Sequence, residues 1–535
     1  MNPLSSVLHS HVRGRASQLA TGSMLSLALL AGCEGQAPAA GAGFALEEAT
    51  IEEIHQAYTR GELSAVQLTG AYLERIEAHD QGAHGLHAIV SLQPGSLLRA
   101  EALDASFART HAFVGPLHGI PILIEDNLDT FDLPTSAGLL ALAESVPPDD
   151  AFVVQRLRAA GAIILGKTNM MELGASSAES CSSAGALTRN AYDATRSSPG
   201  AGCGSAVAVA ANFATAAVAT DPSASFVDSA AANGVVGLRP SFGLVSRDGM
   251  VTGLDQTTMA GPIARTVEDA ALLLEVMQGE DPADPVTHGV ARDRASVPVR
   301  EDGLQGTRVG LVRELAESST FGGVSAPVDK RASQLLIRAL GALRGAGAKV
   351  SGVSIAAIDQ QVTPLLARRH EDNTLAFFID GYLASLGPDA KVHSLAELAA
   401  SGAMLPELVA PRGEAAPSAV PPIQSEAQLE ASRGRVLLRD LLVGLMDAQK
   451  RDVLVYLTIA STAQLSGQES GGSYGVAGQL SAFSGMPSVT VPIGTVGGLP
   501  LGLTMLGRPF QDAQLLSIAR AFEQATRYRV APTVD

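Results

Sequence analysis

The sequence predicts an α/β protein whose sheet is largely covered by helices. Apolar segments of strand length alternate with longer helical segments, most clearly at 308–312 (strand), 328–345 (helix) and 349–353 (strand). Such alternation is typical of strands that are connected by helices. Beyond the first 45 residues the composition does not shift and no internal repeat occurs, so we expect a single domain over residues 46–535.

Composition and charge exclude several classes of partner. The 535 residues carry a net charge of −17, which argues against binding to nucleic acid or to an anionic membrane surface. Tryptophan is absent and only 4% of the residues are aromatic, so a surface that stacks bases is not expected. No spacing of His, Cys and acidic residues is typical of a zinc site. We expect no metal and no cofactor, and nothing in the sequence indicates an oligomeric state.

The N-terminal segment differs from the rest of the chain. An apolar run at 24–31, preceded by two arginines, ends in Leu-Ala-Gly-Cys33. The run is shorter than the ~20 residues that span a bilayer, and it fits a secretory signal. Its end resembles the lipobox of bacterial lipoproteins, which implies a signal peptide at 1–32, lipidation of Cys33 and a flexible tether at 33–45. An ordinary signal peptide with an incidental cysteine is the alternative.

We therefore expect an exported lipoprotein of the bacterial cell envelope, on the periplasmic side. Its contact with the membrane would be the N-terminal lipid anchor alone, because the charge of the remaining chain does not favour an anionic lipid surface.

The first helices of the domain are predicted from their caps. Thr50 with Glu53, and Ser64 with Gln67, fit capping boxes in which each residue of a pair bonds the backbone of the other. Apolar residues follow both boxes at helical spacing. A third helix is expected at 95–109.

A short apolar strand is expected at 120–124, followed directly by Glu125 and two further polar residues. Charged residues at the end of a buried strand are seldom buried without partners, and on spacing alone a solvated strand end is the simpler interpretation. A helix at 151–160 and a strand at 162–165 follow. The Gly-Lys-Thr after that strand is not a phosphate-binding loop, because a strand fills the interval before it.

Residues 194–240 are dominated by small side chains. A loop of Gly, Ser and Pro opens the stretch, a helix of about four turns is expected at 205–218, and a second loop of small residues follows at 220–229. Small side chains allow the backbone to approach a ligand closely. The stretch therefore indicates either a site that faces a substrate or a close-packed helix with ordinary turns.

The C-terminal half continues the alternation up to a closing helix. A segment at 401–424 with five prolines is expected to be irregular and is long enough to cover a site. The other expected elements are strands or turns at 234–238 and 241–247, a helix at 266–277, a surface connection at 281–307, helices over most of 361–400 and at 429–452, strands at 453–457, 489–492 and 501–506, and a helix at 513–527.

Two cysteines follow the predicted signal, Cys181 and Cys203. In an exported protein they could form a disulfide. Two separate buried thiols are the alternative, and the sequence does not decide between them. A nucleophilic role for Cys203 is a third and weaker interpretation.

Seven segments carry a shared signature along the chain. They are GIPILIEDN (119–127), GAIILGKTNMMELG (161–174), NAYD (190–193), the stretch 194–240, GPIART (261–266), LSAFSGMPSVTVP (480–492) and LPLGLTMLGRPF (499–510). In this order they resemble the amidase signature family, from about residue 50 to the end of the sequence. The resemblance implies an α/β/α fold with a mixed central sheet covered by helices on both faces. It also implies hydrolysis or transfer of amide bonds and an amide-like small molecule as ligand.

Members of that family use a Ser–cis-Ser–Lys triad. The lysine is the base, the cis-serine relays the proton and the second serine attacks the carbonyl. In this chain the lysine position holds Glu125. The next loop is one residue shorter than the family's, so the cis-serine position is ambiguous. Counting back from Ser205 without a gap places it on Ala201, which we prefer; counting forward from Pro199 places it on Gly202. Neither residue has a hydroxyl.

The nucleophile position is retained as Ser225, but its loop departs from the family. Pro222, Ser223 and Ala224 replace a residue and two glycines of the family's oxyanion loop. Pro222 removes a main-chain donor, and the loss of both glycines makes a positive φ costly. Val227 stands where the family usually has arginine.

These departures leave two hypotheses. The first is a pseudo-amidase that keeps the fold and a ligand cleft without the reaction, because loss of general-base help costs about 10²–10⁴ in rate and loss of an oxyanion donor about 10²–10³. The second is a working hydrolase in which an ionised Glu125 acts as a base on Ser225 through a water in the place of the cis-serine hydroxyl.

Overall fold

The computed structural model describes residues 44–534 with several gaps. Contacts divide the chain into two units, 1–39 and 40–535, and the predicted signal peptide and Cys33 lie outside the described residues. Also outside are residues 83, 175–185, 222–224, 252–256, 290–299, 301, 371–373, 389, 405–420 and 467–475, and the side chains of Ser225, His370 and Ile423. In the parts that are described, no helix is both long enough and apolar enough to cross a membrane.

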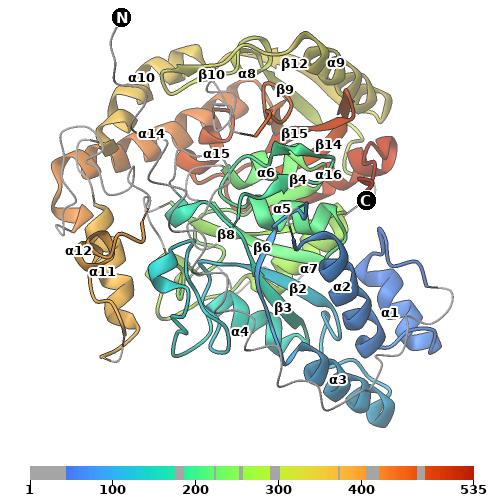
Figure 1. Ribbon diagram of the computed structural model, residues 1–535. Helices are drawn as coiled ribbons and strands as arrows, with labels where there is room; N and C mark the ends of the chain where they lie inside the picture. Colours follow the sequence, from blue (N-terminus) through green and yellow to red (C-terminus); the bar gives the residue numbers. More distant parts are fainter. Residues whose placement is uncertain are drawn as a thin grey trace, which may run out of the picture. The chain divides into compact units, whose positions relative to one another are not determined.

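A mixed sheet of 11 strands forms the centre of the described domain, which confirms the predicted fold class (Figure 1). The strand order is β1-β3-β2-β6-β8-β7-β14-β15-β13-β9-β12. Pairs are parallel among β3, β2 and β6 and among β13, β9 and β12, and antiparallel elsewhere. The strands are β1 (Ile89–Leu92), β2 (Pro121–Glu125), β3 (Ile163–Thr168), β6 (Ala216–Asp221), β7 (Val236–Arg239), β8 (Met259–Ala264), β9 (Arg308–Val312), β12 (Lys349–Val353), β13 (Val453–Leu457), β14 (Ser488–Val496) and β15 (Leu499–Leu506). Two small hairpins are formed by β4 (Arg189–Asn190) with β5 (Asp193–Ser197) and by β10 (Thr320–Phe321) with β11 (Val324–Ser325).

Helices cover the sheet. Every residue of β2, β3, β6 and β8 is buried, so both faces of this part of the sheet are covered. α5 and α6 pack against each other and against central strands, while α7, α9 and α16 contact β8, β12 and β14. The helices are α1 (Ile51–Arg60), α2 (Ala65–His79), α3 (Ser96–Thr110), α4 (Phe152–Ala159), α5 (Cys203–Ala210), α6 (Ser225–Ala232), α7 (Val267–Met277), α8 (Arg313–Glu317), α9 (Lys330–Gly345), α10 (Ala356–Ala367), α11 (Leu375–Ser385), α12 (Leu395–Ala400), α14 (Glu426–Ala448), α15 (Gln479–Ser484) and α16 (Asp512–Thr526).

Both capping boxes form as predicted. The Thr50 hydroxyl accepts the Glu53 N–H (3.2 Å) and the Glu53 carboxylate accepts the Thr50 N–H (2.9 Å) at the start of α1. Ser64 and Gln67 exchange the same pair of bonds at the start of α2. Such caps contribute about 1 kcal/mol each, and they fix where the first two helices begin.

The prediction of a helix over 205–218 is wrong for the second half of that range. α5 ends at Ala210, and β6 begins at Ala216 within the same run of Ala and Val. Asn212 lies between them in a left-handed conformation (φ 58°), which interrupts the helix. An apolar run with no polar face does not distinguish a buried helix from a buried strand.

The strands beside this run also differ from expectation. Glu125 is the last residue of β2 rather than the residue after it, and β3 continues through the Gly-Lys-Thr to Thr168. β8 is absent from the sequence prediction, because the glycine and proline inside it resemble turn residues. Gly261 of β8 lies so close to β7 that a Cβ would stand 2.2 Å from the Leu238 carbonyl oxygen.

Strand direction brings the predicted site segments to one edge of the sheet. β2 and β6 run parallel, with Ile124 opposite Val218. Glu125 and Asp221, the last residues of these strands, therefore lie at the same edge. α6 begins at Ser225, a short distance along the chain from Asp221.

Candidate active site

Glu125 is fully buried at the end of β2. Its Oε2 accepts the backbone N–H of Thr220 in a short hydrogen bond, while its buried Oε1 has no hydrogen-bond partner among the described residues. Burial is the main cause that raises the pKa of Glu125 to about 8; the Thr220 hydrogen bonds oppose the shift, and the charges of Asp221 and Asp126 add to it. At neutral pH the carboxyl is therefore mostly protonated.

The chain that follows β2 is held by buried polar contacts. The Asp126 carboxylate accepts the backbone N–H (3.3 Å) and the hydroxyl of Ser136, and the N–H of Gly138 (3.1 Å). The Asn127 side chain donates to the Thr220 hydroxyl (2.8 Å). These contacts fix the end of β2 against β6 and leave the backbone at Glu125 little freedom.

Lys167 supports the same region and is a residue that sequence reasoning missed. It is fully buried in β3, and its Nζ donates to the carbonyls of Leu128 (2.7 Å) and Pro134 (3.3 Å). A third bond goes to the Thr135 hydroxyl (2.9 Å). Burial lowers the pKa of Lys167, and nearby carboxylates, Asp126 first, oppose this shift. Because three oxygens already accept from the amine, Lys167 is not free to act as a base. Its position inside an apolar strand was the available signal.

The loop that holds the cis-serine position is tied to α6. The Ser229 hydroxyl donates to the Pro199 carbonyl in a short bond, and the Asn233 side chain donates to the Ser198 hydroxyl (2.8 Å). Ala201, at the end of this loop, is fully buried. The loop is therefore held in place even though it offers no hydroxyl at position 201.

Gly202 has little room for a side chain. It precedes α5, and a Cβ at this position would lie 3.1 Å from the Ala219 Cβ and 3.2 Å from the Phe226 Cβ. Carbon atoms normally approach to about 3.5–4.0 Å, so a serine here would crowd β6 and α6. Of the two candidate positions, Ala201 is the better place to restore a hydroxyl.

Cys203 is the first residue of α5 and is buried. Its Sγ lies 3.9 Å from the Asn169 carbonyl oxygen. Cys181 lies outside the described residues, so the disulfide between the two stays a prediction, as does the lipidation of Cys33.

The nucleophile position is placed through its backbone alone. Ser225 begins α6, while its side chain and the oxyanion-loop residues 222–224 lie outside the described part of the chain. The residues on either side are fixed, since Asp221 and Phe226 are fully buried.

A buried ion pair holds the end of β6. The Arg239 Nε lies 2.7 Å from an Asp221 oxygen, and both side chains are fully buried. Arg239 also donates to the Thr257 carbonyl (2.8 Å). Removal of one partner from such a pair leaves an uncompensated charge, which is strongly destabilising. The pair joins separate strands, so no local pattern in the sequence indicated it.

α11 reaches the same site from far along the chain. The Tyr382 hydroxyl donates to an Asp129 oxygen (2.9 Å), and burial raises the pKa of Asp129 to about 7. Apolar residues of α11 and α12 pack against the chain after β2 and after β3, through a cluster that contains Leu139, Met170, Leu173, Val251, Leu375, Ile379, Leu383 and Leu398. The helical region expected at 361–400 therefore forms one side of the site, whereas most of 401–424 lies outside the described residues.

The two positions that the resemblance assigns to the lysine and the cis-serine hold a buried carboxyl and a methyl group. Glu125 is mostly protonated at neutral pH, and position 201 carries no hydroxyl. Across the described ranges, no group of three or more His, Cys, Asp and Glu side chains is arranged to hold a metal ion.

The fold and these segments define an α/β protein of the amidase type. Residues 67–516 match the family described as Amidase, and the chain belongs to this family, whose reaction is the hydrolysis of carbon–nitrogen bonds in amides. It is 33% identical to a subunit of the glutamyl-tRNA(Gln) amidotransferase of Symbiobacterium thermophilum over 499 residues, which cover 89% of this chain and 97% of the relative.

Solved structures give the same family. The native peptide amidase of Stenotrophomonas maltophilia is 35% identical with a TM-score of 0.80, over 91% of this chain and 99% of that one. An amidase family protein of Bacillus anthracis is 28% identical with a TM-score of 0.76, over 91% and 93%. The resemblance read from the seven segments is thereby confirmed.

Proposed function

We propose that this chain is a pseudo-amidase: a member of the amidase family that does not carry out the Ser–cis-Ser–Lys reaction and that retains its fold to bind a ligand. One observation carries the proposal. Glu125, at the position of the family's lysine, is a buried carboxyl that is bonded to the Thr220 N–H and mostly protonated at neutral pH. A protonated acid cannot take the proton from a serine hydroxyl.

The other departures act in the same direction. Ala201 has no hydroxyl to relay a proton, and the oxyanion loop is altered at 222–224. In a catalytic unit whose parts act together, such losses are not additive. Even so, the loss of base help alone typically lowers the rate by about 10²–10⁴.

An amide-like small molecule is the ligand that the family membership favours. The peptide amidase of Stenotrophomonas maltophilia is similar over nearly its whole length, which supports a short peptide amide. A tRNA-linked ligand, suggested by the name of the amidotransferase relatives, fits the net charge of −17 poorly.

A working hydrolase is the second candidate, favoured by the unpartnered Oε1 of Glu125. Because the pKa of Glu125 is raised to about 8, its ionised form predominates only above that pH. An activity that used Glu125 as the base on Ser225 would therefore rise with pH and level off above about 8.

Labelling with a fluorophosphonate, which modifies activated serines, separates the two candidates. We expect no labelling of the purified protein at pH 7 or at pH 9, compared with a catalytically competent peptide amidase as the positive control. Labelling that disappears in Ser225→Ala would contradict the pseudo-amidase, and labelling confined to the alkaline sample would establish the second candidate.

Restoring the lysine and the serine of the family's triad tests whether their absence explains the proposed loss of activity. We expect Glu125→Lys with Ala201→Ser to hydrolyse simple peptide amides better than the parent. Glu125→Lys with Gly202→Ser is the matched control, and it should remain inactive because position 202 is crowded by Ala219 and Phe226. If neither variant is active, the altered loop at 222–224 is the principal block instead.

We also propose that the protein is a lipoprotein of the cell envelope, held through Cys33. The support is the apolar run at 24–31 and its Leu-Ala-Gly-Cys ending. Metabolic labelling with radioactive palmitate should mark the parent and not Cys33→Ala. Equal labelling of the two, or none in a bacterial host, would contradict the anchor.

A further inference from the structure

A cavity, here called the second cavity to separate it from the candidate active site, lies at the opposite edge of the sheet from that site. It has a volume of about 370 Å³ and is lined by residues before α1, after β8, in β14 and at the end of α16. β8 runs antiparallel to β6, and its first residue, Met259, lies opposite Asp221. Arg265, in the wall of this cavity, follows the other end of β8, so the two sites are separated by the strand's length of roughly 17–20 Å.

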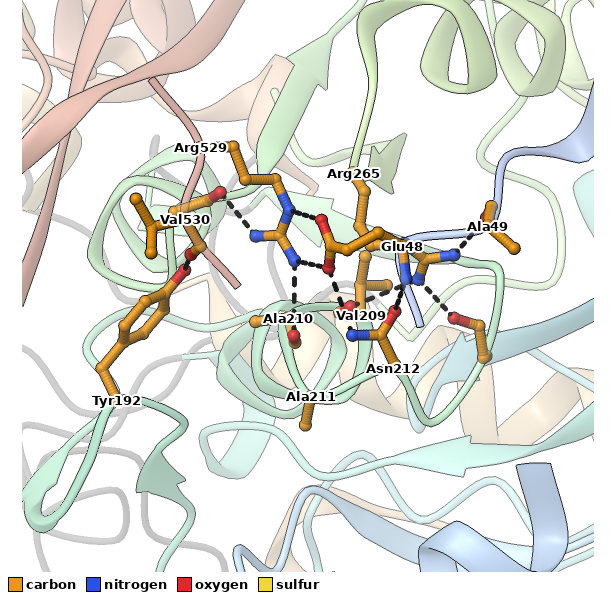
Figure 2. A network of polar contacts seen from close by, with 12 residues as sticks. Glu48, Ala49, Tyr192, Val209, Ala210, Ala211, Asn212, Arg265, Arg529 and Val530 are labelled. Atoms are coloured by element: carbon orange, nitrogen blue, oxygen red, sulfur yellow. Dashed lines mark hydrogen bonds and ion pairs between the residues drawn. The ribbon is translucent and has the colours of Figure 1, made fainter. Parts of the chain in front are cut away.

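Two charged residues of the cavity neutralise each other. Arg529 donates to both oxygens of Glu48 (2.7 Å each). Figure 2 shows Glu48 between Arg529 and Arg265, with Asn212 below it. The Asn212 side chain donates to Glu48 as well (3.2 Å). Glu48 is therefore already satisfied and does not oppose a bound anion strongly.

Arg265 lies in this wall and is held by three backbone carbonyls. Its two terminal nitrogens donate to the carbonyls of Ala49 (2.7 Å), Ala214 (2.8 Å) and Val209 (3.4 Å). The residue is only 3% exposed, and its Nε–H has no acceptor within the described ranges. Its charge is therefore fixed beside the cavity.

Arg527 supplies a second cationic group at the mouth of the cavity. It is exposed and lines the cavity, and its side chain has no hydrogen bond or ion pair to the described residues. Tyr528, the next residue, also lines the cavity. Together with Arg265 these residues give the site donors and positive charge.

Glu523 is an acidic residue of the cavity wall, and its negative charge would repel a bound anion. Its carboxylate accepts the N–H of Val267 (2.9 Å). Burial raises the pKa of Glu523 to about 7, with Asp269 and Glu268 of α7 adding to the shift and Arg520 opposing it. At neutral pH the carboxyl is about half protonated, so the cavity retains a net positive charge.

The remaining wall is apolar. Val491 and Pro492 of β14 line it, and the Tyr528 ring stands 6.2 Å from the Phe522 ring beside it. At the ~30 Å³ that one water occupies in the liquid, the volume has room for roughly a dozen non-hydrogen atoms. The size and lining suit an apolar body with one polar end.

We propose that this cavity binds a small molecule with one carboxylate on a short apolar body. The carboxylate pairs with the exposed Arg527 guanidinium at the mouth, in the positive field to which Arg265 adds, and the apolar body packs against Val491 and Pro492. The site is independent of Ser225 and Glu125, and it does not rest on the proposed loss of catalysis.

Benzoate and its neutral analogue benzamide test the proposal by calorimetry and saturation-transfer NMR on the full domain. We expect benzoate to bind and benzamide, of the same shape, to bind up to about fivefold more weakly, the effect typical of one exposed charge contact. Arg527→Ala should weaken benzoate by about the same factor. Glu523→Gln, which removes the opposing charge, should strengthen it.

Arg338→Ala is the matched control, because Arg338 is an equally exposed arginine on α9 that does not line the cavity. It should leave benzoate binding unchanged. The proposal is overturned if benzamide binds as well as benzoate, if Arg527→Ala behaves like Arg338→Ala, or if inorganic phosphate binds and benzoate does not.

Discussion

At the scale of single residues, the proposal of a pseudo-amidase depends on Glu125, an acid at the position that the resemblance gives to the family's lysine. A buried lysine can be made neutral by burial, whereas a buried glutamate is made neutral by keeping its proton. Glu125 follows the second course, with a pKa raised to about 8 and one oxygen bonded to the Thr220 N–H. At neutral pH this side chain is therefore mostly a neutral acid.

The raised pKa of Glu125 predicts that the free energy of unfolding depends on pH. Since the pKa of Glu125 is raised from 4.5 in the unfolded chain to about 8 in the folded one, its contribution is fully present below pH 4.5 and is lost as the pH rises through about 8. Glu125→Gln, which mimics the protonated acid, should lose less stability over this range, by up to about 1.4 kcal/mol per pH unit. Urea unfolding at pH 5 to 9 measures the difference.

Glu101→Gln on α3 is the control, because Glu101 is exposed. It should keep the slope of the parent. If Glu125→Gln also keeps that slope, the buried carboxyl is ionised in the folded protein and the main support for a pseudo-amidase is lost.

At the scale of elements, α5 connects the candidate site to the opposite edge of the sheet. Its first turn follows the loop at Ala201 and Gly202. Its last turn accepts hydrogen bonds from three arginines, namely Arg75 to the Ala211 carbonyl (2.7 Å), Arg265 to Val209 (3.4 Å) and Arg529 to Ala210 (3.4 Å). Cations at a helix C-terminus stabilise it through the helix dipole and the free carbonyls.

Arg75→Met tests this cap. The side chain is mostly buried, so methionine keeps its packing and removes the bond to Ala211 together with the exposed ion pair to Glu47, which contributes little. We expect a loss of about 1–2 kcal/mol in the free energy of unfolding, the size of a hydrogen bond to a charged group. Arg109→Met, in the exposed last turn of α3, should cost less than about 0.5 kcal/mol. If the two variants lose the same free energy of unfolding, Arg75 does not cap α5.

The sequence correctly predicted the elements that are determined by residues close together in the chain. Thr50 and Ser64 mark helix starts because their partners lie within the same turn. It failed at β6 and β8, where burial against other strands decides the conformation of a run of small residues. The seven signature segments located Glu125 and the 198–202 loop, but not the Asp221–Arg239 pair, which arises from strands that meet only in the folded chain.

At the scale of the whole described domain, Glu48 and Arg529 join segments that are 481 residues apart. Burial alone would raise the pKa of Glu48, but the Arg529 hydrogen bonds and charge lower it below 4.5. A lowered pKa means that this contribution is present above pH 4.5 and is lost as the pH falls through the folded value.

Glu48→Gln should therefore destabilise the domain at pH 7 by about 1 kcal/mol, a partly exposed pair being worth less than a buried one. The difference from the parent should shrink under acid conditions, as measured by thermal unfolding at pH 7 and below pH 4. Glu62→Gln, which breaks the exposed pair with Arg60, should have almost no effect at either pH. A constant cost of Glu48→Gln across that range would contradict an ionic origin.

The sequence separation of Glu48 and Arg529 also determines when their ion pair can form during synthesis of the chain. At about 5–20 residues per second of translation, the 481 residues between the partners take roughly 25–100 s to synthesise. Until then α5 lacks the arginine that bonds to Ala210, and the wall that Arg529 gives to the second cavity does not exist. Nascent chains halted before position 529 should therefore lack both this helix cap and this wall of the cavity.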